Sequence, residues 1–180
     1  MMMEQFGGNG MEPLEIERKY IIYMPDVAAL NAMEGEKWDV RQVYLTGTPE
    51  QGSRRIRRIR DGAGERWYYS EKVRLSATTR IERERQVSGE EAAELLREAD
   101  PEKRPIEKRR WRIPYMGKLI EIDVFPFWAH QAFCEVELES EDEEFSLPDW
   151  VRVYREVSAE NRYNNNNLAR SIPEEEVPHA

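Results

Sequence analysis

The sequence predicts an α+β protein that is mainly β, with eight antiparallel strands and a few flanking helices. Eight segments show the alternation of side chains, with a period of two residues, that is typical of strands. Most connections between them are short and carry turn residues, and short connections favour antiparallel neighbours. Eight strands can close into a barrel that holds side chains or one small ligand, although an open, strongly curved sheet fits the same pattern.

The predicted strands follow one another along most of the chain. They cover residues 15–23, 38–46, 53–60, 65–74, 78–87, 106–113, 118–125 and 132–139. Asp61-Gly62-Ala63-Gly64 lies between the third and fourth strands and is a hairpin signal. Pro114 with Gly117, and then Pro126, mark the breaks after the sixth and seventh strands.

Three helices are predicted from their N-caps. Asp26 precedes a short apolar helix, and Ser88 opens a second helix with Glu91 three residues later, which is the pattern of a capping box. Ser158 is the predicted N-cap of a last helix that extends to Ala169, although the asparagines within this segment are poor helix formers.

A chain of 180 residues predicts one domain with a real hydrophobic core. We expect this domain to span residues 12–170, between a flexible leader at 1–11 and a solvated, flexible tail at 171–180. The leader lacks the basic start and apolar middle of a signal peptide, and Met11 is an alternative start. No apolar run approaches the roughly 20 residues of a membrane span. A cytoplasmic protein without membrane contacts is the expectation.

The composition limits the kinds of site. The net charge of −9 argues against broad nucleic-acid binding, which usually requires a basic domain. Cys134 is the only cysteine, and His130 and His179 are the only histidines, so cysteine-based or histidine-rich metal centres are not expected. A metal would more naturally be a hard divalent cation, Mg²⁺ or Mn²⁺, held by oxygen ligands.

Charged residues occupy one face of strand after strand. In the first strand Glu15, Glu17 and Lys19 point to one side. The same alternation in later strands gives an acidic set and a basic set. The acidic set is Glu15, Glu17, Glu82, Glu84, Glu121, Asp123, Glu135 and Glu137, and the basic set is Lys19, Arg55, Arg57, Lys72, Lys108 and Arg110.

Alternation alone does not tell whether this face is the outside or the interior of a barrel. The opposite faces of strands 118–125 and 132–139 are apolar and require a core. Carboxylates at adjacent positions of one face repel one another unless cations lie between them. A charged interior has to be wet, and it would suit a polyanion gripped by arginine and lysine together with a metal held by carboxylates.

Other site classes find no support in the sequence. It contains neither a P-loop motif nor a dinucleotide-binding glycine motif that opens a helix. The arginine-rich run 54–60 suggests a nucleic-acid patch, but in a strand its side chains divide between two faces. The sequence offers no Ser-His or Cys-His pair that would suggest a covalent mechanism.

Glu15-Ile16-Glu17-Arg18-Lys19 matches the E-x-E-x-K signature of the CYTH superfamily, the triphosphate tunnel metalloenzymes, and the sequence resembles this family over about residues 12–170. The ordered series continues with Arg55-Ile56-Arg57, Lys72, Arg80 with Glu82 and Glu84, Ile106 to Arg110, Glu121 to Phe125, Cys134 to Leu138 and Val157 to Ala169. The short form looks most like bacterial inorganic tripolyphosphatases. Two departures are Glu71, where an aliphatic residue is usual, and the polar tract 165–167.

The resemblance implies an eight-stranded closed antiparallel barrel, or tunnel, whose charged faces point inward. It implies a divalent metal, a small-molecule triphosphate substrate and hydrolysis of a terminal phosphoanhydride. Phosphate binding falls to Lys19, Arg55, Arg57, Lys72, Lys108 and Arg110. Metal binding falls to Glu15, Glu17, Glu121, Asp123, Glu135 and Glu137. Glu17, Glu137 and Lys72 are the catalytic candidates, and Arg80, Glu82, Glu84 and Tyr163 are further candidates. The alternative role of Glu82 and Glu84 is to orient the neighbouring arginines.

Rival functions remain open at this point. The same family includes thiamine triphosphatases, RNA triphosphatases and a class of adenylate cyclase. A cyclase requires a pocket for adenine; the sequence shows no clear one, although Tyr163 or Trp67 could contribute to it. A non-catalytic polyphosphate- or nucleotide-binding module is a further alternative, although it would need little of the acidic set. We expect no nucleic-acid partner, and a homodimer is an open alternative to a monomer.

Overall fold

The computed structural model describes residues 13–47, 50 and 52–179, and the predicted leader at 1–11 lies outside these residues. The predicted order of eight strands is confirmed, and the described residues contain one further strand, β9. The strands are β1 Leu14–Tyr23, β2 Glu36–Tyr44, β3 Gly52–Asp61, β4 Gly64–Arg74, β5 Thr79–Val87, β6 Ile106–Tyr115, β7 Lys118–Val124, β8 Gln131–Glu137 and β9 Val153–Glu156. The helices are α1 Val27–Ala32, α2 Gly89–Leu95 and α3 Asn165–Leu168, with 3₁₀ turns η1 Leu96–Glu98 and η2 Asn161–Tyr163.

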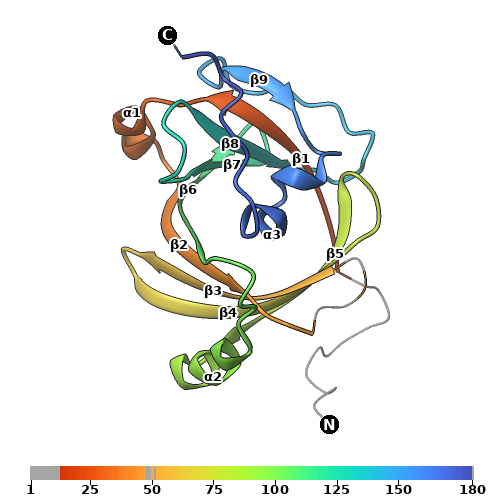
Figure 1. Cartoon of the computed structure of the whole chain (residues 1–180). Coiled ribbons are helices and arrows are strands. Elements are labelled where there is room, and N and C mark those ends of the chain that lie inside the picture. The colour runs from red at the N-terminus through yellow and green to blue at the C-terminus, as the bar shows by residue number, and fades with distance from the viewer. Residues whose placement is uncertain (1–12, 48–49, 51, 180) are drawn as a thin grey trace.

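The strands form a closed antiparallel barrel. Their order is β5-β4-β3-β2-β6-β7-β8-β1-β9, and β1 also pairs with β5, so that β1 to β8 make a ring and β9 lies outside it (Figure 1). The ring closes where Leu14 to Ile16 of β1 pair with Ile81 to Thr79 of β5. The closed barrel is thereby confirmed, and the open sheet is not observed.

Local sequence fixes the tight turns that set the register. In the β3–β4 hairpin, Oδ1 of Asp61 accepts a hydrogen bond from Ala63 N at 2.8 Å, and Gly64 has a φ of 122°. In the β6–β7 hairpin, Met116 and Gly117 have φ values of 47° and 76°, the left-handed pair that a primed turn requires. A one-residue slip in either hairpin would turn the charged face of the strands outward.

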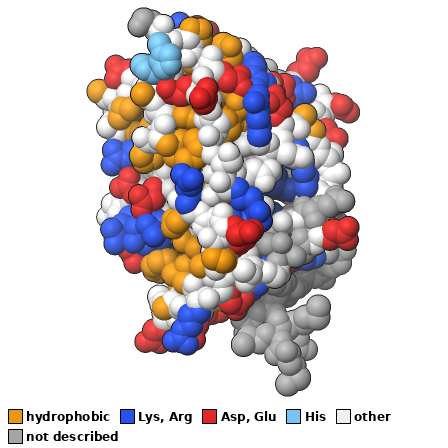
Figure 2. All heavy atoms as spheres, viewed as in Figure 1, with side chains coloured by type: hydrophobic (Ala, Val, Ile, Leu, Met, Phe, Trp, Pro, Cys, Tyr) orange, Lys and Arg blue, Asp and Glu red, His pale blue; other side chains and the backbone are white. Residues whose placement is uncertain are grey.

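Apolar side chains cover the outer face of the barrel. Ile122, Val136 and Leu138 lie in one cluster with α1 and the segment 145–151, and Ile16 packs against it. Ile56 lies in a second cluster, beneath α2 and η1. The outward direction predicted for these five side chains is therefore confirmed. Figure 2 shows charged side chains of both signs on the molecular surface, with apolar side chains between them.

The predicted N-caps of the first two helices are confirmed. Asp26 Oδ1 accepts hydrogen bonds from Ala28 N and Ala29 N at 2.9 and 3.3 Å. Ser88 Oγ accepts one from Glu91 N at 3.1 Å. The predicted capping box is only half formed, since the Glu91 carboxylate accepts a hydrogen bond from Arg85 Nη2 at 2.6 Å.

The last helix differs from the prediction. The segment breaks into η2 and α3, and the N-cap of α3 is Asn164, whose Oδ1 accepts a hydrogen bond from Asn167 N at 2.8 Å. Ser158 instead accepts a hydrogen bond from Lys19 N at 2.9 Å. Asparagine competes well for caps and poorly for helix interiors, which explains the break. Figure 1 shows α3 lying within the ring of strands.

An apolar plug fills the same end of the barrel interior. It comprises Ile21, Tyr44, Ile106, Phe125, Trp128, Phe133, Val157, Tyr163, Leu168, Ala169 and Val177. The inward faces of β1 and β8 begin with charged residues and become apolar at Ile21 and Phe133, while the C-terminal segments supply the rest. The barrel interior is therefore a charged chamber with an apolar floor.

The prediction of a solvated, flexible tail is wrong for its described part, 171–179, which packs against the barrel. Val177 is only 2% exposed within the apolar plug. Trp128 Nε1 donates a hydrogen bond to Pro173 O at 3.0 Å, and Gln131 Oε1 accepts one from Glu176 N at 2.7 Å. Val177 is flanked by Glu176 and Pro178, so no periodic pattern in the sequence predicts its burial. It is buried because it packs against the apolar plug. No helix in the described part of the chain is long and apolar enough to cross a membrane.

Candidate active site

The charged chamber is a cavity of about 750 Å³ enclosed by the barrel strands and the C-terminal segment. Among the described residues, nine basic and eight acidic side chains line it. The basic residues are Lys19, Arg55, Arg57, Lys72, Arg74, Arg80, Lys108, Arg110 and Arg112, and the acidic residues are Glu15, Glu17, Glu82, Glu84, Glu121, Glu135, Glu137 and Glu160. The inward direction of the charged face is therefore confirmed, and all the predicted site residues except Asp123 line the cavity.

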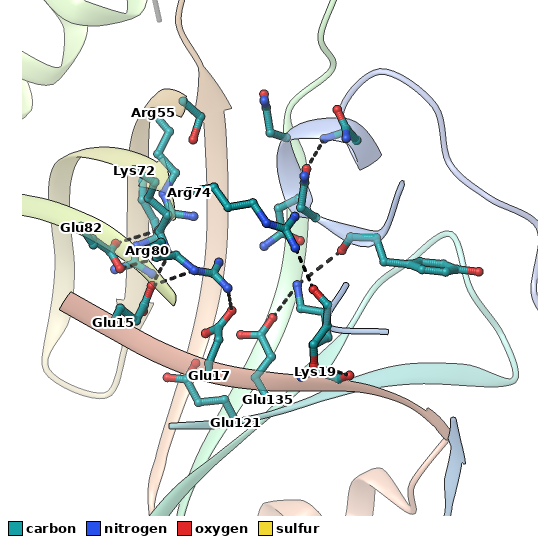
Figure 3. Close-up of a pocket in the computed structure, with 18 of the residues that line it drawn as sticks. Glu15, Glu17, Lys19, Arg55, Lys72, Arg74, Arg80, Glu82, Glu121 and Glu135 are labelled. Carbon is teal, nitrogen blue, oxygen red and sulfur yellow. Dashed lines mark hydrogen bonds and ion pairs between the residues drawn. The ribbon is translucent and has the colours of Figure 1, made fainter. Parts of the chain in front are cut away.

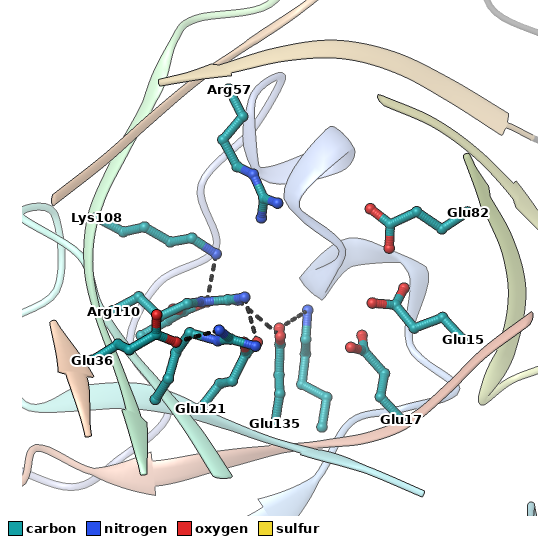
Figure 4. A network of polar contacts seen from close by, with 12 residues as sticks. Glu15, Glu17, Glu36, Arg57, Glu82, Lys108, Arg110, Glu121 and Glu135 are labelled. Carbon is teal, nitrogen blue, oxygen red and sulfur yellow. Dashed lines mark hydrogen bonds and ion pairs between the residues drawn. The ribbon is translucent and has the colours of Figure 1, made fainter. Parts of the chain in front are cut away.

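Some basic side chains lie opposite carboxylates across the chamber, and most of the charges also pair with an opposite charge beside them. Figure 4 shows Arg57, Lys108 and Arg110 reaching inward from one side, opposite Glu15, Glu17 and Glu82. The basic side chains come from β3 and β6, and the carboxylates from β1 and β5. We call the side that carries Arg57, Lys108 and Arg110 the basic wall. Carboxylates also lie on this side, since Arg110 pairs with Glu121 and Glu135, and cations also lie on the opposite side, where Lys72 pairs with Glu15 and Arg80 with Glu17.

Carboxylates adjoin one another across β1, β8 and β7. Glu17 is directly opposite Glu137 in the β1–β8 pairing, and Glu121 is directly opposite Glu135 in the β7–β8 pairing. Burial and the neighbouring Glu135 carboxylate raise the pKa of Glu17. Partial burial, Glu121 and Glu15 raise the pKa of Glu137, which has no ion-pair partner in the described part of the chain. These two carboxyl groups therefore bind a proton more readily than ordinary carboxyl groups do.

Glu135 is the ionised member of this group. Its Oε1 is 2.9 Å from Lys19 Nζ and its Oε2 is 3.0 Å from Arg110 Nη2. Burial opposes the ionisation of Glu135, but Lys19 and Arg110 outweigh it and hold its pKa well below the usual range. Figure 3 shows Glu135 between Glu17 and Lys19 at the chamber wall.

Arg110 connects three carboxylates. Its Nε and Nη2 donate to the two oxygens of Asp123 at 2.6 and 2.7 Å, and it also forms ion pairs with Glu121 and Glu135. Asp123 is 0% exposed and does not line the cavity, because Lys108 Nζ also binds it, at 2.5 Å from its Oδ2. The structure therefore places this predicted metal ligand beneath the basic wall as a counter-ion.

Lys108 is the titratable cation of the basic wall. Burial, together with the neighbouring Arg110, lowers the pKa of Lys108 to about 8, despite its ion pair with Asp123. Its ammonium group lies 5.8 Å from the centre of the Phe125 ring, at the edge of the apolar plug. A bound anion would favour the charged form of this lysine.

A second ion-pair group joins β1, β4 and β5. Lys72 Nζ lies 2.9 Å from Glu15 Oε2 and 3.0 Å from Glu82 Oε2. Burial disfavours the charged form of Lys72, but Glu15 and Glu82 raise its pKa overall. Arg80 Nη2 lies 2.6 Å from Glu17 Oε1, and Figure 3 shows both side chains at the same wall. Lys72 is thus fully charged and already held at the chamber wall.

The two arginines of β3 that line the chamber form ion pairs with carboxylates of β5. Arg55 Nη2 lies 3.3 Å from Glu82 Oε1, and Arg57 Nη2 lies 2.8 Å from Glu84 Oε2. This geometry agrees with the alternative role predicted for Glu82 and Glu84, which was to orient the neighbouring arginines. Arg57 Nε is buried and has no hydrogen-bond partner among the described residues. Burial and Arg55 lower the pKa of Arg57, so an anion would compensate an under-stabilised cation there.

Sequence reasoning missed several residues that line the chamber. Arg112 continues the alternation of Lys108 and Arg110, and its Nε donates to Glu121 Oε1 at 2.8 Å. Arg74 continues that of Ser70 and Lys72, and its Nη2 donates to the Ser158 carbonyl oxygen at 3.0 Å. The alternation places both on the charged faces of their strands, but the predicted basic set left them out. Asn161 and Asn164 to Asn167 also line the chamber, and no periodicity indicated them.

The aromatic candidates for an adenine contact are engaged elsewhere. Tyr163 contributes to the chamber lining, but its side chain is buried in the apolar plug and its hydroxyl group donates a hydrogen bond to Glu176. Trp67 packs against the apolar cluster on the outer face. Trp38 and Tyr68 line the chamber instead, with the Arg112 and Arg57 guanidinium groups 4.3 and 5.9 Å from their ring centres.

The carboxylates of the chamber fit a hard divalent cation. Glu17, Glu121, Glu135 and Glu137 provide oxygen donors at directly opposed strand positions, the ligand type that Mg²⁺ and Mn²⁺ prefer. Like charges in such positions are unfavourable without a cation between them. Glu137 fits best, because no basic side chain in the described part of the chain neutralises it.

A closed antiparallel barrel whose inner cavity is lined by many basic and acidic side chains is a tunnel-type barrel, suited to bind anions together with metal ions. The CYTH domain model matches residues 13–172, and the chain belongs to this family. The resemblance expected from the E-x-E-x-K signature is thereby confirmed, and membership of the family implies a divalent metal.

Individual relatives agree with this assignment. An inorganic triphosphatase of Acetivibrio thermocellus is 31% identical over 159 residues, which is 87% of this chain and 94% of that protein. An inorganic triphosphatase of known crystal structure superposes with a TM-score of 0.56 at 31% identity, over 93% of this chain and 100% of that one. A putative adenylate cyclase from Vibrio parahaemolyticus has a TM-score of 0.50 at 18% identity, over 74% of this chain and 80% of that one, and shares the fold.

Proposed function

We propose that this protein hydrolyses a terminal phosphoanhydride of inorganic tripolyphosphate, with a divalent cation, Mg²⁺ or Mn²⁺, in the charged chamber. The observation that carries the proposal is a single cavity lined by nine basic side chains together with eight carboxylates. Phosphoryl transfer needs mainly positioning and charge stabilisation, and this lining provides both. The relatives named inorganic triphosphatase, at 31% identity, support the same substrate.

The basic side chains bind the phosphate oxygens in this proposal. Arg55 and Arg57 present guanidinium forks, and Lys19, Lys72, Lys108 and Arg110 add charges around the chamber. Arg57 and Lys108 gain most, because each is a buried cation whose pKa is lowered. Asp123 has a positioning role, since it holds both Lys108 and Arg110.

The carboxylates bind the metal and the attacking water. Glu17, Glu121, Glu135 and Glu137 would hold the cation, which when bound supplies charge neutralisation for the phosphates. Glu137 accepts the proton of the water, because its raised pKa brings it closer to the working pH than an ordinary carboxyl group. Glu17 is the second candidate for this role, held by Arg80 at 2.6 Å.

One assay distinguishes the proposal from its rivals. Phosphate release is measured from tripolyphosphate, ATP and thiamine triphosphate, each with Mg²⁺, with Mn²⁺ and with EDTA. We expect orthophosphate and pyrophosphate from tripolyphosphate, only with metal. Cyclic AMP from ATP would indicate a cyclase, and tight binding in EDTA without turnover of any triphosphate would indicate a binding module.

Glu137→Gln tests the assignment of the base. Its turnover should fall about 100-fold or more, the lower range for a general base. Glu139→Gln is the matched control, since Glu139 is exposed just beyond the end of β8 and does not line the chamber. Equal turnover in the two variants would contradict the role of Glu137. The homodimer and the cytoplasmic location remain predictions.

A further inference from the structure

Both histidines of the chain lie together, far from the charged chamber. His130 precedes β8 and His179 lies 49 positions later near the end of the chain, yet their ring centres are 4.3 Å apart. Figure 2 shows the histidine side chains on the surface at the end of the molecule where Figure 1 marks the C-terminus. The carboxylate of Glu175 lies beside them.

The three side chains meet a geometric requirement for a metal site. One ligand atom from each of His130, Glu175 and His179 lies within 4.8 Å of the other two. No imidazole nitrogen of the two histidines has a hydrogen-bond partner among the described residues, and the same holds for Glu175 Oε2. The donor atoms are therefore available to a ligand.

The backbone around the cluster is held in place. Glu175 Oε1 accepts hydrogen bonds from His130 N at 2.5 Å and Gln131 N at 3.2 Å. In return, Gln131 Oε1 accepts hydrogen bonds from the backbone of Glu176 and Val177, at 2.7 and 3.4 Å. This reciprocal pairing fixes the C-terminal segment against the start of β8.

His179 is held near the other two ligands by its neighbours. Val177 is buried in the apolar plug, and Pro178 restricts both its own φ and the conformation of Val177. The chain can therefore place His179 beside His130 at a small entropic cost, which favours binding by a preorganised site.

We propose that His130, Glu175 and His179 form a binding site for a zinc-class divalent cation that fastens the C-terminal segment to the barrel. Two imidazoles and one carboxylate are the ligands of open zinc sites, which keep a fourth position for water. They suit Zn²⁺, Co²⁺ or Ni²⁺ and disfavour Mg²⁺, which prefers oxygen ligands alone. The site thus differs in metal class from the one in the chamber.

The test uses the full-length protein and its histidine NMR signals. Because the chain contains only two histidines, each imidazole signal belongs to one of the two proposed ligands. Zn²⁺ is titrated in the presence of excess Mg²⁺, which occupies the carboxylates of the chamber. Both imidazoles should respond together and saturate at one zinc ion per chain. Independent responses, or none, would overturn the proposal.

Two single variants test the ligands, and a third serves as the control. Glu175→Gln can still accept the backbone hydrogen bonds, and His179→Asn is exposed, so both should fold. Each should weaken zinc binding at least about tenfold, the lower end of the cost of losing even an outer-shell partner. Glu174→Gln is the control, since Glu174 is exposed and lies outside the cluster, and it should bind zinc like the wild type. Unchanged zinc affinity in His179→Asn would contradict the site.

Two further readouts test the fastening of the segment. Zinc at about 100 times its Kd should raise the Tm of the wild type by roughly 5–10 °C and that of His179→Asn by about half as much or less. Hydrolysis of tripolyphosphate with Mg²⁺ should be the same in wild type and His179→Asn, so a failure of the zinc site is separable from a failure of the proposed function. A zinc-induced rise of equal size in His179→Asn would overturn the fastening role.

Discussion

The interior of this barrel has two regions that differ in chemistry but share their strands. On β1 the inward face changes from Lys19 to Ile21, and on β8 from Glu135 to Phe133. Lys19 Nζ lies 4.9 Å from the centre of the Phe133 ring, so the two regions meet through a cation–π contact. The charged chamber is held by directional ion pairs, whereas the apolar plug is held by packing.

The comparison shows how a charged cavity is kept in shape. Buried charges are costly and gain little net stability from their partners. The plug stabilises the fold because its apolar side chains are removed from water. It also anchors the strands whose other halves carry the charged residues. Stability and chemistry are therefore separated along the same strands, and substitutions in the two regions should have different consequences.

The largest effect is expected at the centre of the ion-pair network. Arg110→Met leaves Asp123, which is 0% exposed, with Lys108 as its remaining cation. Loss of one partner from a buried ion pair should lower the free energy of unfolding by about 3–5 kcal/mol. Arg109→Met is the control, because Arg109 pairs with the exposed Asp39 on the outer face. Urea denaturation measures both, and equal stability would contradict the assignment.

The next effect concerns the apolar plug. Trp128 is 4% exposed and packs against Phe125, Phe127, Phe133 and Tyr163. Trp128→Ala should lower the free energy of unfolding by about 3 kcal/mol, whereas Trp128→Phe should cost less because it leaves a smaller cavity. The metal dependence of turnover, measured below the unfolding temperature, should be the same in both variants. A changed metal requirement in Trp128→Ala would show that the two regions are coupled.

A smaller effect separates binding from stability. Arg57 forms its ion pair with Glu84, which is partly exposed, and its Nε has no partner among the described residues. Arg57→Ala should weaken tripolyphosphate binding about tenfold, which is the loss of one charge-assisted hydrogen bond, with little change in stability. Steady-state KM and urea denaturation check the two parts. A large loss of stability with unchanged KM would reverse the assignment.

The smallest effect is a dependence on pH. The pKa of Lys108 is lowered from 10.5 to about 8, so the folded protein binds fewer protons than the unfolded chain between these pH values. This group alone should make stability rise with pH across that interval. Tripolyphosphate affinity should instead fall as pH rises through about 8, because the lysine loses its charge.

Lys108→Met tests the source of this pH dependence. Its affinity at neutral pH should resemble that of the wild type at high pH, and the step near pH 8 should vanish. Equilibrium binding without turnover, measured from neutral to alkaline pH, provides the comparison. An identical step in Lys108→Met would assign the titration to another group.

The strands and their charged faces were predictable because a period of two residues is a local property. Glu15, Glu121 and Glu135 were assigned to one face by counting alone, but only the family resemblance placed that face inside. Asp123 shows the limit of this method, because alternation predicts the side to which a carboxylate points and not which cations will cover it.

The C-terminal part was less predictable for a physical reason. The helix propensities of Asn164 to Asn167 argued against the helix that Ser158 suggested, and the caps decided the outcome. Val177 is buried against the apolar plug. This apolar surface forms only after Phe125 and Phe133, which are distant in sequence from Val177, have come together. The exposed strand β9 has no alternation of its own, since its pairing with β1 determines it.

Strand β1 determines when the site can first exist. One of its edges pairs with β8, where Glu17 lies opposite Glu137, and its other edge is shared between β5 and β9. Every partner of β1 therefore follows it by a long stretch of chain, whereas most other strands pair with sequence neighbours. Closing such a long loop is entropically costly and slow. During synthesis Glu15, Glu17 and Lys19 are made first. Lys72 and Arg80, the partners of Glu15 and Glu17, follow with β4 and β5, but Glu135 and Glu137 reach Lys19 and Glu17 only with β8, so the site is complete only after β8 has emerged.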